Sequence, residues 1–469
     1  MNSSYIWIFA PLVLSGILLL LRRWITLVAI IATTASVLLA VLAAWLPSQE
    51  QISLWRWVFP FSDTFLVLGR RLVLSSTDRP AIIIIYLTAA LWFGAVPLLR
   101  PSRLFVPLSM AIIALFTAAI AVEPFLFAAL LIELAVLLSI PILAPPGRAP
   151  GRGILRYLTF QTLGMPFILI AGFLLAGLEI SPGEPIYIAV AIASLAIGFA
   201  LLLAVFPFHT WIPMLAEESH PYPAAFIFLL LPTGILLLGL NFLDTFTWLY
   251  ENPNSELLLQ VVGTVMVVTA GIWAATEKNI ARMMGFAVLL DIGFSLLAIS
   301  LLIRSENETY RILFFTGLVP RGLSLGVLAL ALSSLIGKIR SFDLDDVRGL
   351  AKIYPVNSIA IVVAIFCFAG LPLLAGFPIK LGVIEGVSGQ SLAIAIWVIL
   401  GAFGLLIGGI RASLAMVSDE EETLESLPVS RFLVIFLVIG VVLLFLIGLL
   451  PNLLMRIITG FPGAFTLLG

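Results

Sequence analysis

Long apolar runs, repeated along almost the whole chain, constrain its fold more than any other feature. A helix that crosses the hydrocarbon core of a membrane needs about 20 mainly apolar residues, because each residue adds about 1.5 Å. Only helices and closed barrels satisfy their backbone groups in lipid, so the sequence predicts an all-α polytopic membrane protein in a lipid bilayer. About fourteen transmembrane helices are expected, at 5–21, 24–46, 81–99, 104–122, 124–144, 154–178, 185–206, 223–243, 257–275, 283–303, 311–336, 356–379, 391–414 and 430–453.

The composition excludes several other classes of protein. Hydrophobic residues make up 62% of the 469 residues and charged residues only 10%, whereas soluble domains contain about 25% charged residues. The net charge of −1 offers no electrostatic basis for binding nucleic acid. Cys367 is the single cysteine, so neither an internal disulfide nor a cysteine-based metal site is expected. The first residues lack the features of a signal peptide, and the run at 5–21 is therefore predicted to be retained as the first span.

Proline and glycine interrupt two of the predicted spans, the seventh in "AVFPFHTWIP" (204–213) and the twelfth in "FAGLPLLAGFPIK" (368–380). Broken helices are tolerated in membranes where they line a polar cavity or are buried in protein, and paired breaks indicate an inverted repeat. The breaks lie five spans apart, which predicts two inverted five-helix repeats with broken helices 7 and 12. The predicted units are 1–103, containing helices 1–3 and a surface hairpin at 47–80, the first repeat at 104–243, the second repeat at 257–414, and the last helix and tail at 430–469.

The orientation of the chain is predicted from its basic residues. Lysine and arginine are more frequent in the loops after odd-numbered spans than after even-numbered spans. Because cytoplasmic loops carry the excess of these residues, the odd-numbered loops are expected to face the cytoplasm. Both termini and the hairpin at 47–80 would then lie on the non-cytoplasmic side.

Ionisable residues inside the spans are the main functional candidates, because a charge in hydrocarbon costs roughly 2.5–3.5 kcal/mol on insertion scales. Glu133 has about ten apolar residues on either side and is expected near mid-membrane, either in a proton relay or in a packing hydrogen bond. Arg321 cannot release its proton, and Asp291 is its expected partner by span order, in a structural or a functional pair. Lys380 follows the break in the twelfth span, either as a functional group or as a lysine that reaches the membrane surface.

The loop at the first helix break contains the remaining polar candidates. A neutral imidazole there could transfer protons, and hydrogen bonds that cap the broken helix are the alternative. We find no glycine-rich phosphate loop, metal-spaced Cys/His cluster or catalytic triad in the sequence, so no catalytic, cofactor-binding or metal-binding residues are predicted. The loop candidates are Pro207, His209, Glu217, Glu218 and His220.

Four segments carry a family resemblance. "FPFHTWIP" (206–213) resembles the "PFHxWLP" signature of the antiporter-like membrane subunits of respiratory complex I, the NADH-quinone oxidoreductase, and of Mrp-type cation/proton antiporters. "FAGLPLLAGFPIK" (368–380) resembles their "AGIPPxxGFxxK". Weaker resemblances are found in "EKNIARMMGFAVLLDIGFSLLAISL" (277–301) and "GLVPRGLSLGVLAL" (317–330). Together with the order of the spans, the resemblance covers nearly the whole chain.

The resemblance implies a proton-translocating module of two half-channels joined by a central axis of buried charges. The family's glutamate in the fifth span falls on Glu133, and its lysine in the broken twelfth span falls on Lys380. The chain also departs from the family. Leu202 stands at the lysine position of the seventh span, Arg321 replaces the lysine of the eleventh span, and Gly317 replaces the histidine before it. The eighth span contains neither lysine nor histidine.

Leucine and arginine do not exchange protons at physiological pH, which leaves two alternatives open. In the first, protons cross by another route through Glu133, Asp291, Lys380 and water. In the second, the chain is a degenerate, non-pumping structural subunit. The expected function is that of a proton-translocating or scaffold membrane subunit of a complex I-like NADH/quinone oxidoreductase. A subunit of a multi-chain Mrp-type cation/proton antiporter is the alternative, and a single-chain secondary transporter is a further one.

The resemblance also implies where the redox chemistry takes place. No cofactor and no redox reaction are expected on this chain. Quinone, flavin and iron–sulfur clusters are expected only in partner subunits, which would include other membrane subunits of a multi-subunit complex. The expected location is an energy-transducing membrane, such as the bacterial plasma membrane.

Overall fold

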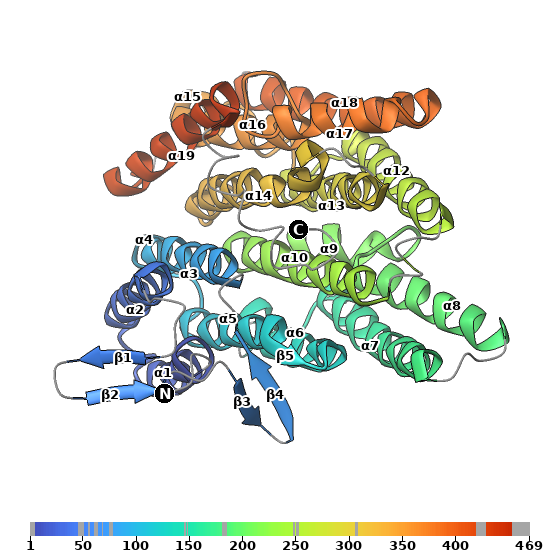
Figure 1. The fold of residues 1–469 in the computed structure, drawn as a ribbon. Helices are drawn as coiled ribbons and strands as arrows, with labels where there is room; N and C mark the ends of the chain where they lie inside the picture. The colour runs from blue at the N-terminus through green and yellow to red at the C-terminus, as the bar shows by residue number, and fades with distance from the viewer. Residues whose placement is uncertain are drawn as a thin grey trace.

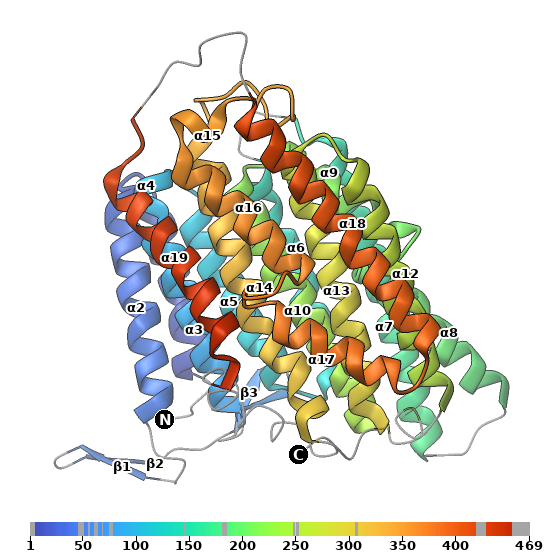
Figure 2. The same ribbon diagram turned by 90° about the horizontal axis from the view of Figure 1, so that it is seen from above.

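The computed structural model is almost entirely helical (Figures 1 and 2). It describes residues 5–45, 51–54, 57–60, 64–67, 69–74, 78–144, 147, 149–180, 185–246, 249, 253–304, 308–418 and 428–452. The described helices are η1 (Tyr5–Phe9), α1 (Ala10–Leu20), α2 (Ile25–Trp45), α3 (Arg79–Gly94), α4 (Val96–Leu99), α5 (Phe105–Ala121), η3 (Phe125–Phe127), α6 (Ala128–Leu143), α7 (Arg152–Ile180), α8 (Pro185–Leu202), η4 (Phe208–Thr210), α9 (Trp211–Glu218), α10 (Pro221–Thr245), α12 (Pro253–Thr276), α13 (Ile280–Arg304), α14 (Glu308–Leu335), α15 (Leu350–Ile353), α16 (Pro355–Ala369), α17 (Phe377–Ser388), α18 (Leu392–Val417) and α19 (Arg431–Leu449).

Each of the predicted apolar runs contains a helix, which confirms the all-α membrane class. Ten helices of the described part are long and apolar enough to cross a membrane, by length and composition. The remaining runs form shorter apolar helices, so the number fourteen is not confirmed by this criterion. The shorter helices are Ile6–Leu20, Phe105–Ala121, Tyr187–Leu202 and Pro355–Ala369.

Local sequence signals explain where several helices begin. Proline occupies the first turn of α3, α10 and α16, where its missing N–H would have had no partner within the helix. Ser391 caps α18, since its hydroxyl accepts a hydrogen bond from the Ile394 N–H at 3.5 Å.

The centre of the bundle is α13. In its most apolar stretch 94% of the residues are buried, against 22% in α19 at the edge of the bundle. Figure 1 shows α13 and α14 between α10 on one side and α16, α17 and α18 on the other. A polar side chain on the inner faces of α13 or α14 is therefore shielded from lipid by several helices.

Helices α12 and α18 approach each other at glycines. A Cβ atom built on Gly271 would lie 2.0 Å from the carbonyl oxygen of Gly401, and one on Gly404 would lie 2.3 Å from that of Gly271. Both obstacles are backbone atoms, so no side-chain rotation could relieve the clash. Small residues of this kind allow helix backbones to pack closely in membranes.

Two β-hairpins lie at the end of the bundle opposite α9 (Figure 2). Strand β3 (Thr64–Val67) pairs antiparallel with β4 (Arg70–Val73) through a turn in which Gly69 has φ +77°, within the segment 47–80 where a surface hairpin was expected. β4 also pairs with β5 (Val122–Glu123). The hairpin of β1 (Gln51–Leu54) and β2 (Trp57–Pro60) was not predicted. The other residues of 47–80 and the tail beyond 452 lie outside the described part of the chain.

Both predicted helix breaks are present. The second lies between α16 and α17, where Gly370 ends α16 in a left-handed conformation with φ +78°. The first lies between α8 and α9, but it begins earlier than the predicted interruption at Pro207. α8 already ends at Leu202, because Ala204 has φ +57°, which a right-handed helix cannot continue.

Candidate functional site

Three ionisable side chains from three helices meet inside the bundle. Asp291 comes from α13, Arg321 from α14 and Lys380 from α17, and we call these three residues the Asp291 cluster. Arg321 Nε donates a hydrogen bond to Asp291 Oδ2 at 2.5 Å, and Lys380 Nζ lies 3.9 Å from Asp291 Oδ1. The Asp291, Arg321 and Lys380 side chains are 15%, 4% and 7% exposed. One carboxylate therefore lies between two buried cations, and Lys380 does not extend to the surface.

Neutral polar groups hold the guanidinium of Arg321 in place. Its Nη1 donates to the Thr233 hydroxyl of α10 at 3.2 Å, and its Nη2 donates to the Ser295 hydroxyl of α13. Ser295 in turn donates to the carbonyl oxygen of Asp291 at 2.9 Å. These partners fix Arg321 against Asp291, because a buried ion pair is favourable only when its remaining hydrogen-bonding groups are satisfied. Thr233 and Ser295 are neutral residues and were not predicted as site residues.

The break between α16 and α17 supplies a partner for Lys380. Lys380 Nζ donates to the carbonyl oxygen of Phe368, in the last turn of α16, where carbonyls lack helical partners. The negative end of the helix dipole favours a cation there. The ammonium also lies 4.9 Å from the ring centre of Phe294 and 5.8 Å from that of Phe368.

Cavities lie on two sides of Lys380. One has a volume of about 30 Å³ and is lined by all members of the Asp291 cluster, with Phe294 and Gly317 among the other residues. A second, of about 230 Å³, is lined by Lys380, by both sides of the helix break and by α18. A buried water molecule needs about 10–15 Å³ of space and polar partners, so the first cavity can hold water next to the ammonium. The second is lined by apolar side chains apart from Lys380.

Glu133 lies on α6, apart from the Asp291 cluster. The Thr162 hydroxyl of α7 donates to its Oε1 at 2.7 Å, while its Oε2 is buried without a hydrogen-bond partner among the described residues. No ion pair in the described part of the chain joins Glu133 to the Asp291 cluster.

Leu202, the residue that the motif spacing assigns to the family's seventh-span lysine, is the last residue of α8. Its side chain is buried and packs so closely on Gly164 that a Cβ there would lie 2.7 Å from Leu202 Cδ2. Its carbonyl oxygen accepts a hydrogen bond from Gln161 Nε2 at 3.0 Å. Gln161 was not predicted as a site residue, although a glutamine inside the apolar run at 154–178 is a visible signal.

The two histidines of the first break lie in different surroundings. The His209 ring stacks on Phe206, with the ring centres 5.4 Å apart, and burial lowers its pKa. His220 caps α10, because its Nδ1 accepts a hydrogen bond from the Tyr222 N–H at 3.3 Å. His220 thus caps the helix that follows the broken one, and burial lowers its pKa to about 4.

The pKa of His220 predicts a pH dependence of stability. Between its ordinary pKa of 6.5 and the folded value of about 4, the unfolded chain binds a proton that the folded chain does not. The stability should therefore fall by about 2–3 kcal/mol as the pH drops from about 6.5 to about 4. Thermal unfolding in lipid nanodiscs across this range measures the effect. His220→Asn, whose amide oxygen can replace Nδ1 as the capping acceptor but does not titrate, should show a smaller loss; equal losses in both proteins would contradict the assignment.

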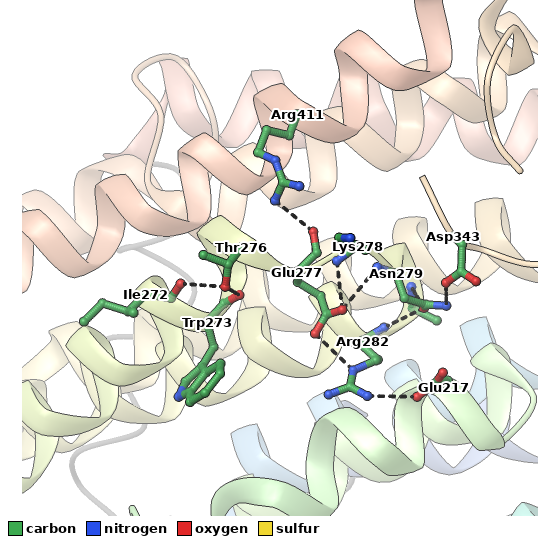
Figure 3. Close-up of polar contacts among 11 residues, drawn as sticks. Glu217, Ile272, Trp273, Thr276, Glu277, Lys278, Asn279, Arg282, Asp343 and Arg411 are labelled. Carbon is green, nitrogen blue, oxygen red and sulfur yellow. Dashed lines mark hydrogen bonds and ion pairs between the residues drawn. The ribbon is translucent and has the colours of Figure 1, made fainter. Parts of the chain in front are cut away.

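The two glutamates lie in the last turn of α9 and have structural partners. Glu218 Oε2 accepts from the Gly153 N–H at the start of α7, at 2.7 Å. Glu217 pairs with Arg282 at 3.2 Å, and Arg282 also pairs with Glu277 at 3.0 Å (Figure 3). Arg411 of α18 donates to the carbonyl oxygen of Glu277 at 3.0 Å in the same region. These contacts join α9 to the turn between α12 and α13 and to α18.

The fold and the site together define the class of the protein. It is an integral membrane protein with two broken helices, and one of the breaks holds a lysine in a buried ion cluster.

The comparisons with known proteins identify the relatives. Residues 183–408 match the family described as NADH:quinone oxidoreductase/Mrp antiporter, TM. NADH-quinone oxidoreductase subunit N of Thioalkalivibrio sulfidiphilus is 28% identical over 280 residues, which cover 58% of this chain and 56% of the relative. The match thus spans about half the length of that curated relative. The chain is a divergent relative of the antiporter-like membrane subunits of complex I and of Mrp-type antiporters, as its motifs indicated.

Solved structures support the fold over the full length. A chain of the Mrp complex from Dietzia sp. DQ12-45-1b superposes with a TM-score of 0.81 at 17% identity, covering 99% of this chain and 97% of the other. A chain of respiratory complex I from Thermus thermophilus superposes with a TM-score of 0.70 at 20% identity, covering 96% and 100%. At these identities the likeness shows the fold alone.

Proposed function

We propose that the chain is a proton-translocating membrane subunit of a complex I-like NADH/quinone oxidoreductase and couples electron transfer in partner subunits to proton movement. The observation that carries the proposal is the Asp291 cluster at the second helix break. A subunit of an Mrp-type cation/proton antiporter is the second candidate, because a chain of an Mrp complex has the same fold.

The cluster supports proton movement through its charge balance. Two cations share one carboxylate, so the buried group carries an excess positive charge, which is costly away from water. Arg321 cannot lose its proton, and its Nε donates a 2.5 Å hydrogen bond to Asp291. Of the two cations, Lys380 is therefore the one that can release and regain a proton.

The surroundings of Lys380 offer a route for that proton. Water in the cavity of about 30 Å³ would accept it on the side of Asp291. Arg321 then serves to position Asp291 and does not replace the family lysine as a proton carrier.

The setting of the chain follows from the same proposal. Other membrane subunits would flank it, and quinone, flavin and iron–sulfur clusters would be held by partner subunits. The loops after odd-numbered spans would face the cytoplasm of an energy-transducing membrane such as the bacterial plasma membrane. The hairpins formed by β1–β4 would then face the opposite side.

Replacing Lys380 in the assembled complex tests the proposal. Lys380→Ala and Glu133→Gln are each expected to lower proton pumping in reconstituted vesicles about a hundredfold, the lower end of the range for lost proton-transfer groups. Lys338→Ala is the matched control, because Lys338 lies in the loop after α14, 5.4 Å from the ring centre of Tyr354 and outside the site.

The outcomes separate the candidate functions. Unchanged pumping in both variants, with the complex intact, would leave the chain as a structural subunit. Pumping that depends on a quinone and an electron donor supports the oxidoreductase, whereas cation/proton exchange without either supports the antiporter.

A further inference from the structure

A cavity of about 180 Å³ lies between helices of the two predicted repeats, apart from the Asp291 cluster. Its walls come from α8 and α10 on one side and from α12 and α13 on the other. Ser255 is the one polar side chain among the described residues that line it. Apolar cavities of about 150 Å³ stay dry and bind apolar molecules. The cavity therefore suits an apolar ligand and does not suit water.

The cavity opens toward lipid between α8 and α12. Leu258 of α12 and Ala196 of α8 both line it, and Leu258 is 47% exposed while Ala196 is also exposed. The adjacent Ile197 and Leu257 are exposed as well, so the apolar outer surface of the bundle continues on both sides of the opening. Figures 1 and 2 show α8 and α12 at the same edge of the bundle. An apolar chain of the bilayer can thus enter sideways without passing through water.

The deep wall of the cavity lies inside the protein. Leu236 of α10 and Leu296 of α13 form part of this wall, and both are buried. Leu203 and Val205 line the cavity on either side of Ala204, the left-handed residue of the first helix break. A molecule that fills the cavity therefore contacts the first helix break, which lipid on the outside of the bundle does not reach.

The length and polarity of the cavity match one leaflet of a bilayer. Its wall from Ile192 to Leu203 is about 16 Å long at about 1.5 Å per residue. The hydrocarbon core is about 30 Å thick, so one leaflet contributes about 15 Å. Ser255 lies in the first turn of α12, whereas Glu277, after the last turn, is joined to α9 through Arg282. The polar end of the cavity therefore points away from α9, toward the membrane surface on the side of the β-hairpins.

We propose that this cavity binds one acyl chain of a membrane phospholipid, whose headgroup lies at the Ser255 end. The inference goes beyond the proposed function and does not depend on it, since it rests on the lining, the opening and the length of the cavity. The bound chain supplies the wall atoms with van der Waals partners that an empty space lacks. The tail of a quinone is also apolar, but its ring needs several polar groups, and Ser255 is the one that the described lining offers.

Photo-crosslinking of the assembled complex in lipid nanodiscs tests the proposal. The nanodiscs contain a phospholipid with a diazirine in its acyl chain, and mass spectrometry identifies the labelled residues. Label is expected on the buried Leu236 and Leu296. Ala196→Phe places a ring in the opening and should lower this labelling about tenfold, which corresponds to about 1.4 kcal/mol of binding free energy. Ala193→Phe is the matched control and should leave it unchanged, because Ala193 is exposed on the same helix but does not line the cavity.

The results that would overturn the proposal are distinct from those that bear on proton pumping. Label confined to outward-facing residues such as Leu257 and Val261 would show that no acyl chain enters, and equal labelling of Leu236 in both variants would contradict the site. Labelling of Leu236 by a quinone with a diazirine in its tail, and not by the phospholipid, would assign the cavity to quinone. Pumping by the Lys380→Ala complex tests the proposed function separately.

A second variant serves if the Ala196→Phe protein does not assemble. Gly239 of α10 lines the cavity, and a Cβ there would meet the Phe199 ring at 3.4 Å, an ordinary contact. Gly239→Val therefore fills part of the cavity from the opposite wall and should also lower the labelling of Leu296. Unchanged labelling in this variant would equally count against a bound acyl chain.

Discussion

Asp291→Asn is expected to destabilise the protein by about 3–5 kcal/mol, the range found when one partner of a buried ion pair is removed. Asp291 is the carboxylate of the cluster, so its loss leaves Arg321 and Lys380 as two buried cations without a countercharge. The side chains of both cations are less than a tenth exposed and cannot regain water without moving helices. Thermal unfolding in lipid nanodiscs should show a markedly lower Tm.

Two further variants make this result specific. Asp345→Asn removes the carboxylate of an exposed ion pair, in which the Asp345 side chain is 85% exposed and the Arg348 side chain 54%. This change should alter the stability by less than about 1 kcal/mol. Asp291→Asn combined with Arg321→Gln removes one positive charge together with the negative one and should recover part of the loss. An Asp291→Asn protein as stable as the wild type would show that the cluster is not ionised as described.

Gly271→Ala is expected to cost about 3 kcal/mol, at the upper end of the range for overpacked cores. The added Cβ would lie 2.0 Å from the Gly401 carbonyl oxygen, and α12 and α18 would have to separate to admit it. α18 also lines the larger cavity beside Lys380, so the same change should alter that cavity. Thermal unfolding measures the first effect, and proton pumping by the surviving complex measures the second.

Gly16→Ala is the matched control for this substitution. A Cβ on Gly16 of α1 would meet nothing within 4 Å, so alanine there should be neutral or stabilise the helix by up to about 1 kcal/mol. Equal stability of the Gly271→Ala and Gly16→Ala proteins would contradict the close approach of α12 and α18.

Much of the architecture could be predicted from the sequence. Apolar runs of sufficient length must become helices in lipid, because each backbone group has to be satisfied within its own segment. The break at Gly370 was visible for a related reason, since glycine and proline disfavour the helix locally. Asp291 and Arg321 were matched by span order, because buried charges in a membrane require partners.

The polar groups around these charges were not visible in the sequence. Thr233, Ser295 and Gln161 are ordinary neutral residues in apolar spans, and their importance depends on what faces them across the bundle. The start of the first break was also misplaced, because the left-handed conformation of Ala204 is not encoded by a glycine or a proline. A side chain's partner on a distant helix leaves no local pattern in the chain.

The sequence by itself therefore determined the class of the protein, the helices and the ionisable residues, since hydrophobicity and backbone hydrogen bonding act locally along the chain. Only the tertiary structure decided that Lys380 is buried beside Asp291, that His220 and Glu218 serve as caps, and that Gln161 faces Leu202. These contacts arise from the packing of helices that are distant in sequence. Each of these polar groups has its effect because it is buried, and it becomes buried only after the helices have come together.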